Sequence, residues 1–263
     1  MNSITANSTT AMQDRAGAPH IERIRHETRR RSLRVETIDR RTPGMLRIIV
    51  AGDDLAGFVS AAPDDHVKIF APAPSGEIER RDYTPRRYDP QARTLAIDFA
   101  VHDAGPATQW ALGARPGDML EIGGPRGSAV VSPDVSRWLL IGDETALPAI
   151  GRRIEEATAG NHITSVVAVA GPQEHQSFET HADLTALWAY RPLSAGNDPA
   201  ALLAVIKSLD IAPQTFVWIA AEASVARAIR TCLVEQRGHP LSWTKAAGYW
   251  LMGQADAHEK KID

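Results

Sequence analysis

The hydrophobic pattern of this 263-residue chain changes at Pro133. Before Pro133, short runs of alternating apolar and polar residues follow one another with little helical pattern between them, at 33–38, 46–50, 66–70, 80–84, 94–101 and 118–122. Six such strands at short spacing predict a small antiparallel β-barrel. After Pro133, continuous apolar runs alternate with helical periodicity, which predicts a parallel sheet covered by helices on both faces. A two-domain fold is therefore expected, with a β domain followed by an α/β domain.

The spacing of apolar residues predicts which side chains face the two cores. In the run 94–101, Leu95, Ile97 and Phe99 are expected to point inward and Asp98 outward. In the second half, buried strands are expected at 138–141, 163–170, 216–220 and within 241–250. The helices between them should carry their apolar faces at 147, 150, 154 and 157, over 202–209, and at 225, 229 and 233.

Composition limits the class of protein. A hydrophobic content of 43% and a charged content of 23% are those of a soluble globular chain. The net charge of −3 gives no overall case for nucleic-acid binding or membrane insertion. Cys232 is the only cysteine, which excludes an intramolecular disulfide and a cysteine-based zinc site and favours a reducing, cytoplasmic location. The nine histidines show no metal-ligand spacing, so no protein-bound metal is expected.

The N-terminal region is polar and then rich in arginine. Its first 18 residues contain no apolar segment, so neither a signal peptide nor a membrane anchor is predicted, and a disordered tail is expected over residues 1–20. The arginines over 23–41 raise the alternative of an RNA-binding arm. No aromatic residue interleaves with them, and acidic residues such as Glu27 and Glu36 dilute the charge, which favours a solvated surface without a nucleic-acid partner.

The stretch at 80–89 combines side chains that ordinary packing does not require. On an extended chain Arg81 and Tyr83 point to one face and Thr84 to the other, and Pro85 ends the strand. A flavin needs a cation for its diphosphate, a flat ring against its isoalloxazine and a small hydroxyl near N5. An exposed edge strand with solvated arginines explains the same residues, so both interpretations stay open on this stretch alone.

Four motifs follow one another along the chain: DDHVKIF at 64–70, RDYTPRR at 81–87, GGPRGS at 123–128 and GDETALPA at 142–149. In this order they resemble the siderophore-interacting protein family of FAD-dependent ferric-siderophore reductases, which are ferredoxin-reductase-like flavoproteins. The resemblance covers residues 21–253. It implies an N-terminal antiparallel six-stranded FAD-binding barrel at 21–130 and a C-terminal parallel-sheet, nicotinamide-binding α/β domain at 131–263.

The resemblance implies a noncovalent FAD, with Arg81 on the diphosphate, Tyr83 against the isoalloxazine and Thr84 near N5. It also implies further contacts around the same cleft from Phe99, His102, Gly105, Ala107 and Thr108. Gly105 would open a short helix whose free backbone N–H groups suit a diphosphate. Taken alone, a simple glycine-proline turn would explain Gly105 equally well, and a structural histidine would explain His102 better than a ligand contact.

For the electron donor, NADH or NADPH, the resemblance implies contacts at the carboxyl edge of the parallel sheet from Gly142, Asp143, Thr145, Ala146, Glu222, Tyr249 and Trp250. Asp143 is also suited to capping the helix that follows it. No arginine stands at 170–174 after the second buried strand, which favours NADH. Arg152, Arg153 or Arg191 could still approach a 2′-phosphate in the fold.

Two positions depart from the family pattern. Ala221 replaces a glycine, and its methyl could crowd a nicotinamide; Leu251 replaces an arginine, whose charge Lys245 could supply instead. The family also implies local positive charge that attracts an anionic ferric chelate. Candidates for that charge are Lys68, Arg86, Arg87 and Lys245, each of which could equally be an ordinary surface cation.

Together these inferences predict a cytoplasmic reductase that passes electrons from NADH or NADPH through FAD to the Fe(III) of a siderophore. No side chain need act as nucleophile or general base, because the flavin supplies the redox chemistry. The nearest alternative is a flavin reductase with another acceptor, such as a ferredoxin or a quinone. A non-catalytic protein that binds flavin or siderophore is the second alternative, kept open by Ala221 and Leu251.

Overall fold

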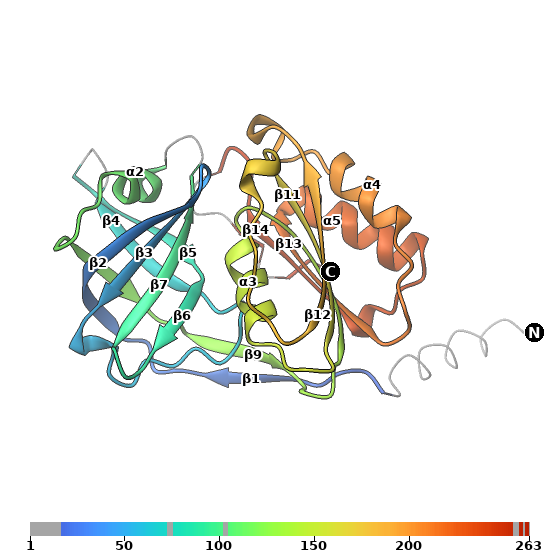
Figure 1. Ribbon diagram of the computed structural model, residues 1–263, viewed down its shortest axis with the longest axis horizontal. Helices are drawn as coiled ribbons and strands as arrows, with labels where there is room; N and C mark the ends of the chain where they lie inside the picture. Colours follow the sequence, from blue (N-terminus) through green and yellow to red (C-terminus); the bar gives the residue numbers. More distant parts are fainter. Residues whose placement is uncertain (1–16, 73–75, 102–104, 255–257, 260, 263) are drawn as a thin grey trace, which may run out of the picture.

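The computed structural model describes residues 17–72, 76–101, 105–254, 258–259 and 261–262. Most of the tail predicted at 1–20, and His102, therefore lie outside the described residues. The described chain forms a β domain and an α/β domain side by side (Figure 1). No described helix combines the length and the apolar character needed to cross a bilayer.

The β domain is a single antiparallel sheet of seven strands: β2 (Arg30–Thr42), β3 (Met45–Ala51), β4 (Val67–Pro72), β5 (Ile78–Tyr83), β6 (Pro85–Asp89), β7 (Thr94–Ala100) and β8 (Met119–Gly123). The antiparallel curled sheet is confirmed, with seven strands instead of six. The additional strand arises because the stretch 80–89 contains two strands, which Thr84 separates.

The order of the strands explains why this sheet curls. It runs β5-β4-β8-β2-β3-β7-β6, so β5 and β6 are its two edges. Those edges are consecutive in the chain, with only Thr84 between them, and the sheet must therefore curl until its edges approach each other. Leu33, Ile48 and Ile97 are among the fully buried side chains inside it. The helix α2 (Pro106–Gly113) packs Ala107 and Ala111 onto this core at one end (Figure 1).

The α/β domain contains a five-stranded sheet, all of whose neighbours are parallel. In spatial order its strands are β12 (Asp183–Tyr190), β11 (His162–Val169), β10 (Arg137–Asp143), β13 (Thr215–Glu222) and β14 (Thr244–Trp250). The predicted parallel sheet is confirmed. The edge strand β12 was not predicted, because most of its side chains are only partly covered and it lacks a continuous buried run.

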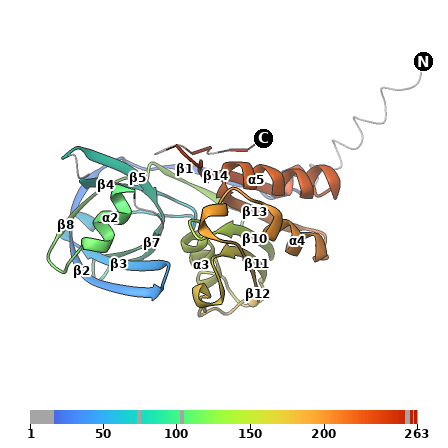
Figure 2. The ribbon, with the colours of Figure 1, turned by 90° about the horizontal axis from the view of Figure 1, so that it is seen from above.

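Helices cover both faces of this sheet. On one face, α3 (Leu147–Glu155) buries Leu147, Ile150 and Ile154, as its periodicity predicts. On the other face lie α4 (Ala200–Ser208) and α5 (Ala223–Arg230). Figures 1 and 2 show α3 on the side of the sheet towards the β domain, with α4 and α5 away from it.

The remaining elements connect these units. A two-stranded antiparallel ribbon of β1 (Ile21–Arg25) and β9 (Gly127–Val131) runs beneath both domains in Figure 1. Short helical segments complete the chain: η1 (Asp53–Leu55), η2 (Pro172–Glu174), η3 (Leu193–Ala195), η4 (Thr231–Gln236), which extends α5, and η5 (Leu241–Trp243).

Candidate functional site

Tyr83 stands at the end of β5, where the two edges of the curled sheet meet. Its ring centroid lies 4.5 Å from that of Phe99, which in turn lies 5.9 Å from Trp110 of α2. The side chain of Thr108 forms a hydrogen bond with the Tyr83 phenol, so α2 and β5 are joined at this point. Burial raises the pKa of Tyr83 to about 12, against the opposing effects of the Thr108 hydrogen bond and the Arg81 charge. The ring is thus held firmly as a neutral phenol.

Phe99 occupies a different place from the one expected. It is fully buried in the core of the curled sheet, beneath Tyr83, and does not reach the surface of a cleft. The prediction that it points inward is confirmed, whereas the expectation that it lines the cofactor cleft is not met. Phe99 can support the Tyr83 ring from below but cannot contact a cofactor directly.

Arg81 shares a strand face with Tyr83. The two residues lie opposite Ile69 and Val67 of β4, both of which are fully buried, so all four point to the inner side of the sheet. The Arg81 guanidinium pairs with Glu79 and donates to the carbonyl oxygen of Arg80 at 2.8 Å. Arg81, Tyr83 and Thr108 therefore converge at one end of the β domain.

The N-terminus of α2 lies at the same end of the β domain as Arg81 and Tyr83. Gly105 is its N-cap, and no described side chain caps the helix. The first N–H to bond within the helix is that of Gln109, to the Gly105 carbonyl at 3.0 Å, so the N–H groups of Ala107 and Thr108 precede the helical ladder. Among the described residues, and apart from Gly105 and its chain neighbours, no heavy atom lies within 4 Å of the position that a Cβ on Gly105 would take. A cation, an aromatic ring and an open helix N-terminus fit the diphosphate and ring of FAD.

At the carboxyl edge of the parallel sheet, Asp143 joins three strands. Its carboxylate accepts hydrogen bonds from the Thr145 N–H at 2.9 Å, from the Glu222 N–H at 3.0 Å and from the Trp250 indole at 2.9 Å. Asp143 is also fully enclosed. Its oxygens are thus used to hold the ends of β10, β13 and β14 together. The alternative that Asp143 caps the following helix is wrong, because the N-cap of α3 is Ala146 and no side chain caps it.

Other residues predicted to contact the nicotinamide donor at this edge also have structural roles. A Cβ on Gly142 would lie 2.6 Å from both the Ala146 Cβ and the Ala220 carbonyl oxygen, so glycine allows α3 to pack against β10. Ala146 itself is buried. Glu222 caps α5 by accepting from Ser224 and Val225, and these hydrogen bonds hold its pKa low although burial acts to raise it.

The edge faces the Tyr83 end of the β domain. His258 lies 3.7 Å from Asp82 of β5, and the negative charges of Asp82 and Asp143 both act on the Tyr249 phenol of β14. Burial, together with these carboxylates, raises the Tyr249 pKa well above its ordinary value. Residues expected to contact flavin and nicotinamide therefore lie on facing surfaces of the two domains.

The two departures from the family pattern lie away from this facing surface or on its margin. Ala221 is fully buried, and its methyl packs in the core on the α4 and α5 side of the sheet. It does not stand where it would crowd a nicotinamide. Leu251 forms an isolated bridge with Gln254.

The four basic residues predicted to attract an anionic ferric chelate differ in their surroundings. Lys68 pairs with Asp82 at 3.2 Å, and Lys245 pairs with Asp64 at 2.5 Å across the domain boundary. Although burial acts to raise the Asp64 pKa, the Lys245 charge and hydrogen bond keep it below its ordinary value. Arg87 is exposed. Arg86 is only 3% exposed, so its predicted place on the approach path for a chelate is wrong.

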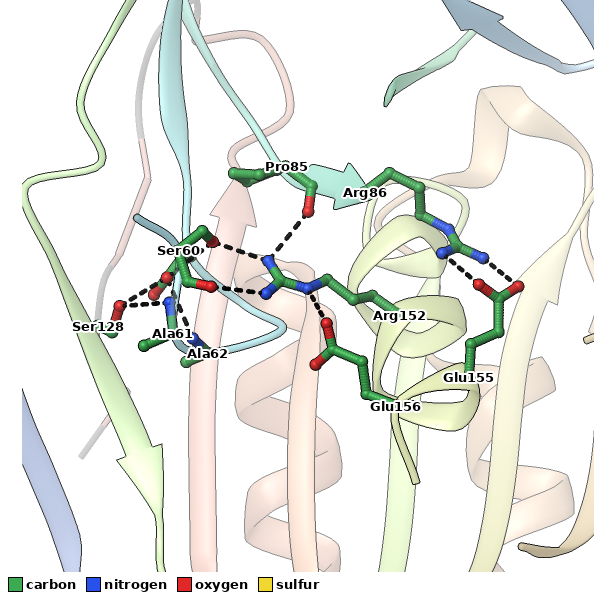
Figure 3. A network of polar contacts seen from close by, with 10 residues as sticks. Ser60, Ala61, Ala62, Pro85, Arg86, Ser128, Arg152, Glu155 and Glu156 are labelled. Atoms are coloured by element: carbon green, nitrogen blue, oxygen red, sulfur yellow. Dashed lines mark hydrogen bonds and ion pairs between the residues drawn. The ribbon is translucent and has the colours of Figure 1, made fainter. Parts of the chain in front are cut away.

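Arg86 belongs instead to a contact network between α3 and the β domain (Figure 3). Its guanidinium donates to both carboxylate oxygens of Glu155 on α3, at 2.7 and 2.6 Å, and lies 3.7 Å from Asp98. Asp98 also accepts two hydrogen bonds from Arg47, at 2.6 and 2.7 Å. Asp98 lies on the outer face of the sheet, as predicted, yet its side chain is only 2% exposed, because Arg47 and the Arg86–Glu155 pair cover it.

Arg152 makes the other half of this network. It donates to the Ser60 hydroxyl at 2.8 Å, the Ser60 carbonyl at 2.9 Å and the Pro85 carbonyl at 3.0 Å (Figure 3). Its Nε donates to Glu156 at 2.6 Å. Arg152 therefore does not face a nucleotide, and Arg153 stacks over the Trp138 ring at 4.2 Å. Sequence patterns do not reveal such contacts, because their partners lie about 70 to 90 residues away.

Of the three arginines considered for the donor, Arg191 stands at the carboxyl edge. It follows β12 and pairs with Glu144 at 2.9 Å, with its own side chain 5% exposed. One of its guanidinium nitrogens, Nη1, is buried and has no hydrogen-bond partner among the described residues. Glu144 lines a shallow open pocket that also includes Leu147 and Ala170. Burial and the Asp143 charge raise the Glu144 pKa to about 7, with Arg191 opposing them.

Fold and site together define a two-domain flavoprotein of the ferredoxin-reductase-like class. Ferredoxin-NADP+ reductase from Plasmodium falciparum, at 9% identity, shares the fold with a TM-score of 0.61 over 84% of this chain and 97% of its own. At this identity the likeness concerns the fold alone.

The chain belongs to the siderophore-interacting protein family. The family model described as siderophore-interacting protein matches residues 135–253, and the siderophore-interacting FAD-binding domain matches 34–80 and 78–129. An NADPH-dependent ferric-chelate reductase from Escherichia coli is 33% identical over 87% of this chain and 96% of its own length. The crystal structure of a siderophore utilization protein from T. fusca is 35% identical, with a TM-score of 0.83, over 91% of this chain and 98% of its own.

Proposed function

We propose that this protein is an FAD-dependent ferric-siderophore reductase that uses NADPH or NADH as its electron donor. The observation that carries the proposal is the convergence of Arg81, Tyr83 and the open N-terminus of α2 opposite the carboxyl edge of the parallel sheet. Bound FAD would accept two electrons from a reduced nicotinamide and pass them singly to Fe(III).

The chain's own residues would bind and orient. Arg81 and the first-turn N–H groups of α2 would neutralise the diphosphate, and Tyr83, supported by Phe99, would present a flat ring to the isoalloxazine. Thr84, at the gap between β5 and β6, would supply a hydroxyl near N5. These roles require no nucleophile or general base.

The ferric chelate would approach as a substrate, without ligands from the protein. Arg87 is exposed and can attract an anionic chelate, whereas carboxylates offset the charges of Lys68 and Lys245. The single cysteine and the need for a reduced nicotinamide favour the cytoplasm as the location.

A comparison of acceptors separates this proposal from a general flavin reductase. Initial rates of NADPH oxidation should be higher with ferric siderophores than with ferricyanide, a quinone or a ferredoxin at equal concentration. Catecholate and hydroxamate chelates would both be assayed, with a ferrous trap to measure released Fe(II). Ferric siderophores that are reduced no faster than ferricyanide would contradict the siderophore assignment, while a faster rate with ferredoxin would favour that partner.

We further propose that Arg191 contacts the donor's 2′-phosphate and favours NADPH. The buried Nη1 without a described partner is a charged donor available to an anion. His175 and Tyr190 beside it are joined by a 2.8 Å hydrogen bond, with His175 stacked on Trp188 at 4.5 Å, which gives a flat surface suited to a purine. This proposal takes up the alternative that Arg191 approaches a 2′-phosphate, in place of the preference for NADH based on the end of β11.

Replacing Arg191 with alanine should weaken binding of 2′,5′-ADP by a factor of roughly 10 to 100, because a hydrogen bond to a charged group contributes about 1.5–3 kcal/mol. Binding of 5′-AMP should change little. Isothermal calorimetry measures both affinities, and Arg153→Ala is the matched control because Arg153 stacks on Trp138 instead. An equal loss of affinity for the two nucleotides would contradict the proposed phosphate contact.

A further inference from the structure

Helix α3 connects the two surfaces on which the proposed reaction depends. Its N-terminus follows the 142–146 turn at the carboxyl edge of the parallel sheet. Its last turns carry Arg152 and Glu155, which contact the β domain directly. At nine residues the helix is about 13 Å long, so one rigid element extends from the nicotinamide edge to the flavin-motif strand.

The β-domain segment that α3 contacts is the continuation of the predicted flavin motif. Arg152 donates to the carbonyl oxygen of Pro85, the residue directly after Thr84, at 3.0 Å. Glu155 accepts both hydrogen bonds from the side chain of the next residue, Arg86. Two consecutive residues beyond Thr84 are thus bound to the same helix of the other domain (Figure 3).

Arg152 also contacts a second β-domain segment. Its guanidinium donates to the hydroxyl and the carbonyl of Ser60, at 2.8 and 2.9 Å. The Ser60 hydroxyl bonds to Asp65, which in turn accepts a 2.6 Å hydrogen bond from Ser128 at the start of β9. One planar side chain therefore joins the loop at 60–65 and the motif strand to α3.

The chemistry of these contacts favours a positioning role over simple charge neutralisation. The Arg152 charge is already balanced by Glu156, at 2.6 Å. Its other three hydrogen bonds go to neutral oxygens of Ser60 and Pro85. The N–H groups of the planar guanidinium, a fork of fixed geometry, point at these oxygens, and the ammonium group of a lysine cannot reproduce that arrangement. Electron transfer as hydride is sensitive to placement, since a misplacement of about 1 Å can lower a rate about 100-fold.

We propose that Arg152 is a positioning residue that sets the Thr84–Pro85 segment of the flavin motif relative to the nicotinamide edge, by binding the Pro85 carbonyl and the Ser60 loop to α3. Arg86 and Glu155 form the second attachment of the same helix. The inference rests on the proposed function for its catalytic consequence. Its structural part, that Arg152 restrains residues 84–87, stands independently of a cofactor.

The first test uses the protein without FAD. Amide hydrogen exchange of residues 84–87 would be compared in the wild type and in Arg152→Ala. Loss of the fork should accelerate exchange of the Arg86 and Arg87 amides at least tenfold, while the α4 amides on the far side remain unchanged. Unchanged exchange at 84–87 would overturn the proposed restraint.

The second test uses the FAD-loaded protein. Single-turnover reduction of the flavin by saturating NADPH should slow by about 10- to 100-fold per bound flavin in Arg152→Ala, with FAD content and the NADPH affinity within twofold of wild type. Arg152→Lys should recover thermal stability but not the rate. Glu156→Gln is the matched control: it removes the ion pair but keeps the contacts to Ser60 and Pro85, so its rate should stay near wild type.

These results distinguish the possible failures. A lower melting temperature with an unchanged single-turnover rate in both Arg152 variants would mean that the arginine only stabilises the fold, which overturns the inference. A full recovery of the rate by Arg152→Lys would overturn the role of the fork. If neither NADPH nor NADH reduces the wild-type flavin, the proposed function fails, while the exchange experiment still decides whether Arg152 restrains the motif.

Discussion

Replacing Arg81 with alanine should yield a folded protein that loses most of its FAD during purification. Arg81 lies on the inner face of β5 with Tyr83, near the open N-terminus of α2. A charge-assisted hydrogen bond to a phosphate contributes about 2 kcal/mol, so FAD affinity should fall roughly 30-fold. The ratio of flavin absorbance to protein absorbance measures the occupancy.

Arg80→Ala is the matched control for this substitution. Arg80 is the neighbouring residue on β5, points to the opposite face and is exposed, so its loss should leave FAD content unchanged. Circular dichroism would verify that both variants remain folded. Stoichiometric FAD in purified Arg81→Ala would contradict the diphosphate role of Arg81.

Replacing Arg86 with leucine should lower the free energy of unfolding by about 3 kcal/mol, because it removes a buried guanidinium that pairs with the partly exposed Glu155 and lies beside the buried Asp98. Glu155 would lose both of its hydrogen bonds to Arg86, and Asp98, with 2% of its side chain exposed, would keep only Arg47. Urea denaturation followed by fluorescence measures the change. The melting of the two domains should also become less cooperative, since the variant removes an attachment between them.

Arg87→Leu tests directly whether Arg87, and not the buried Arg86, attracts the ferric chelate. Arg87 is adjacent in sequence but exposed, so its replacement should change stability by no more than about 0.5 kcal/mol. It should instead raise the KM for an anionic ferric chelate. Unchanged stability in Arg86→Leu, together with a raised KM for the chelate, would restore the sequence-based hypothesis that Arg86 serves the approach of substrate.

Much of the fold follows from local patterns. The alternation at 94–101 correctly predicts which side chains lie in the core of the curled sheet, and the spacing of Leu147, Ile150 and Ile154 correctly predicts the buried face of α3, because each pattern reflects the period of a single element. Ala96 and Asp98 on the outer face are buried as well, which alternation does not predict. β12 escapes the same reasoning, since an edge strand has no buried run. The split of 80–89 into two strands could not be predicted from a local pattern, because it depends on how all seven strands curl until the two edges of the sheet approach each other.

The candidate site is predictable to a smaller extent. Tyr83 and Thr108 were both identified, and the structure brings them into contact. The burial of Arg86 and the contacts of Arg152 depend on how the domains pack, and no local spacing encodes that arrangement. Adjacent arginines such as Arg86 and Arg87 look alike in sequence, yet Arg86, at the register shift between Pro85 and Arg87, is buried against α3, whereas Arg87 stays exposed.

The central claim is tested most directly by two anaerobic mixing steps. The FAD-loaded protein is first mixed with NADPH, and a ferric siderophore is then added in at least two equivalents per flavin. The proposed function predicts that the flavin absorbance band bleaches on the first mixing. It then predicts that the band returns on the second mixing, with two Fe(II) released per flavin to a ferrous trap. A flavin band that neither NADPH nor NADH bleaches, or one that bleaches but is not restored by the ferric siderophore, would contradict it.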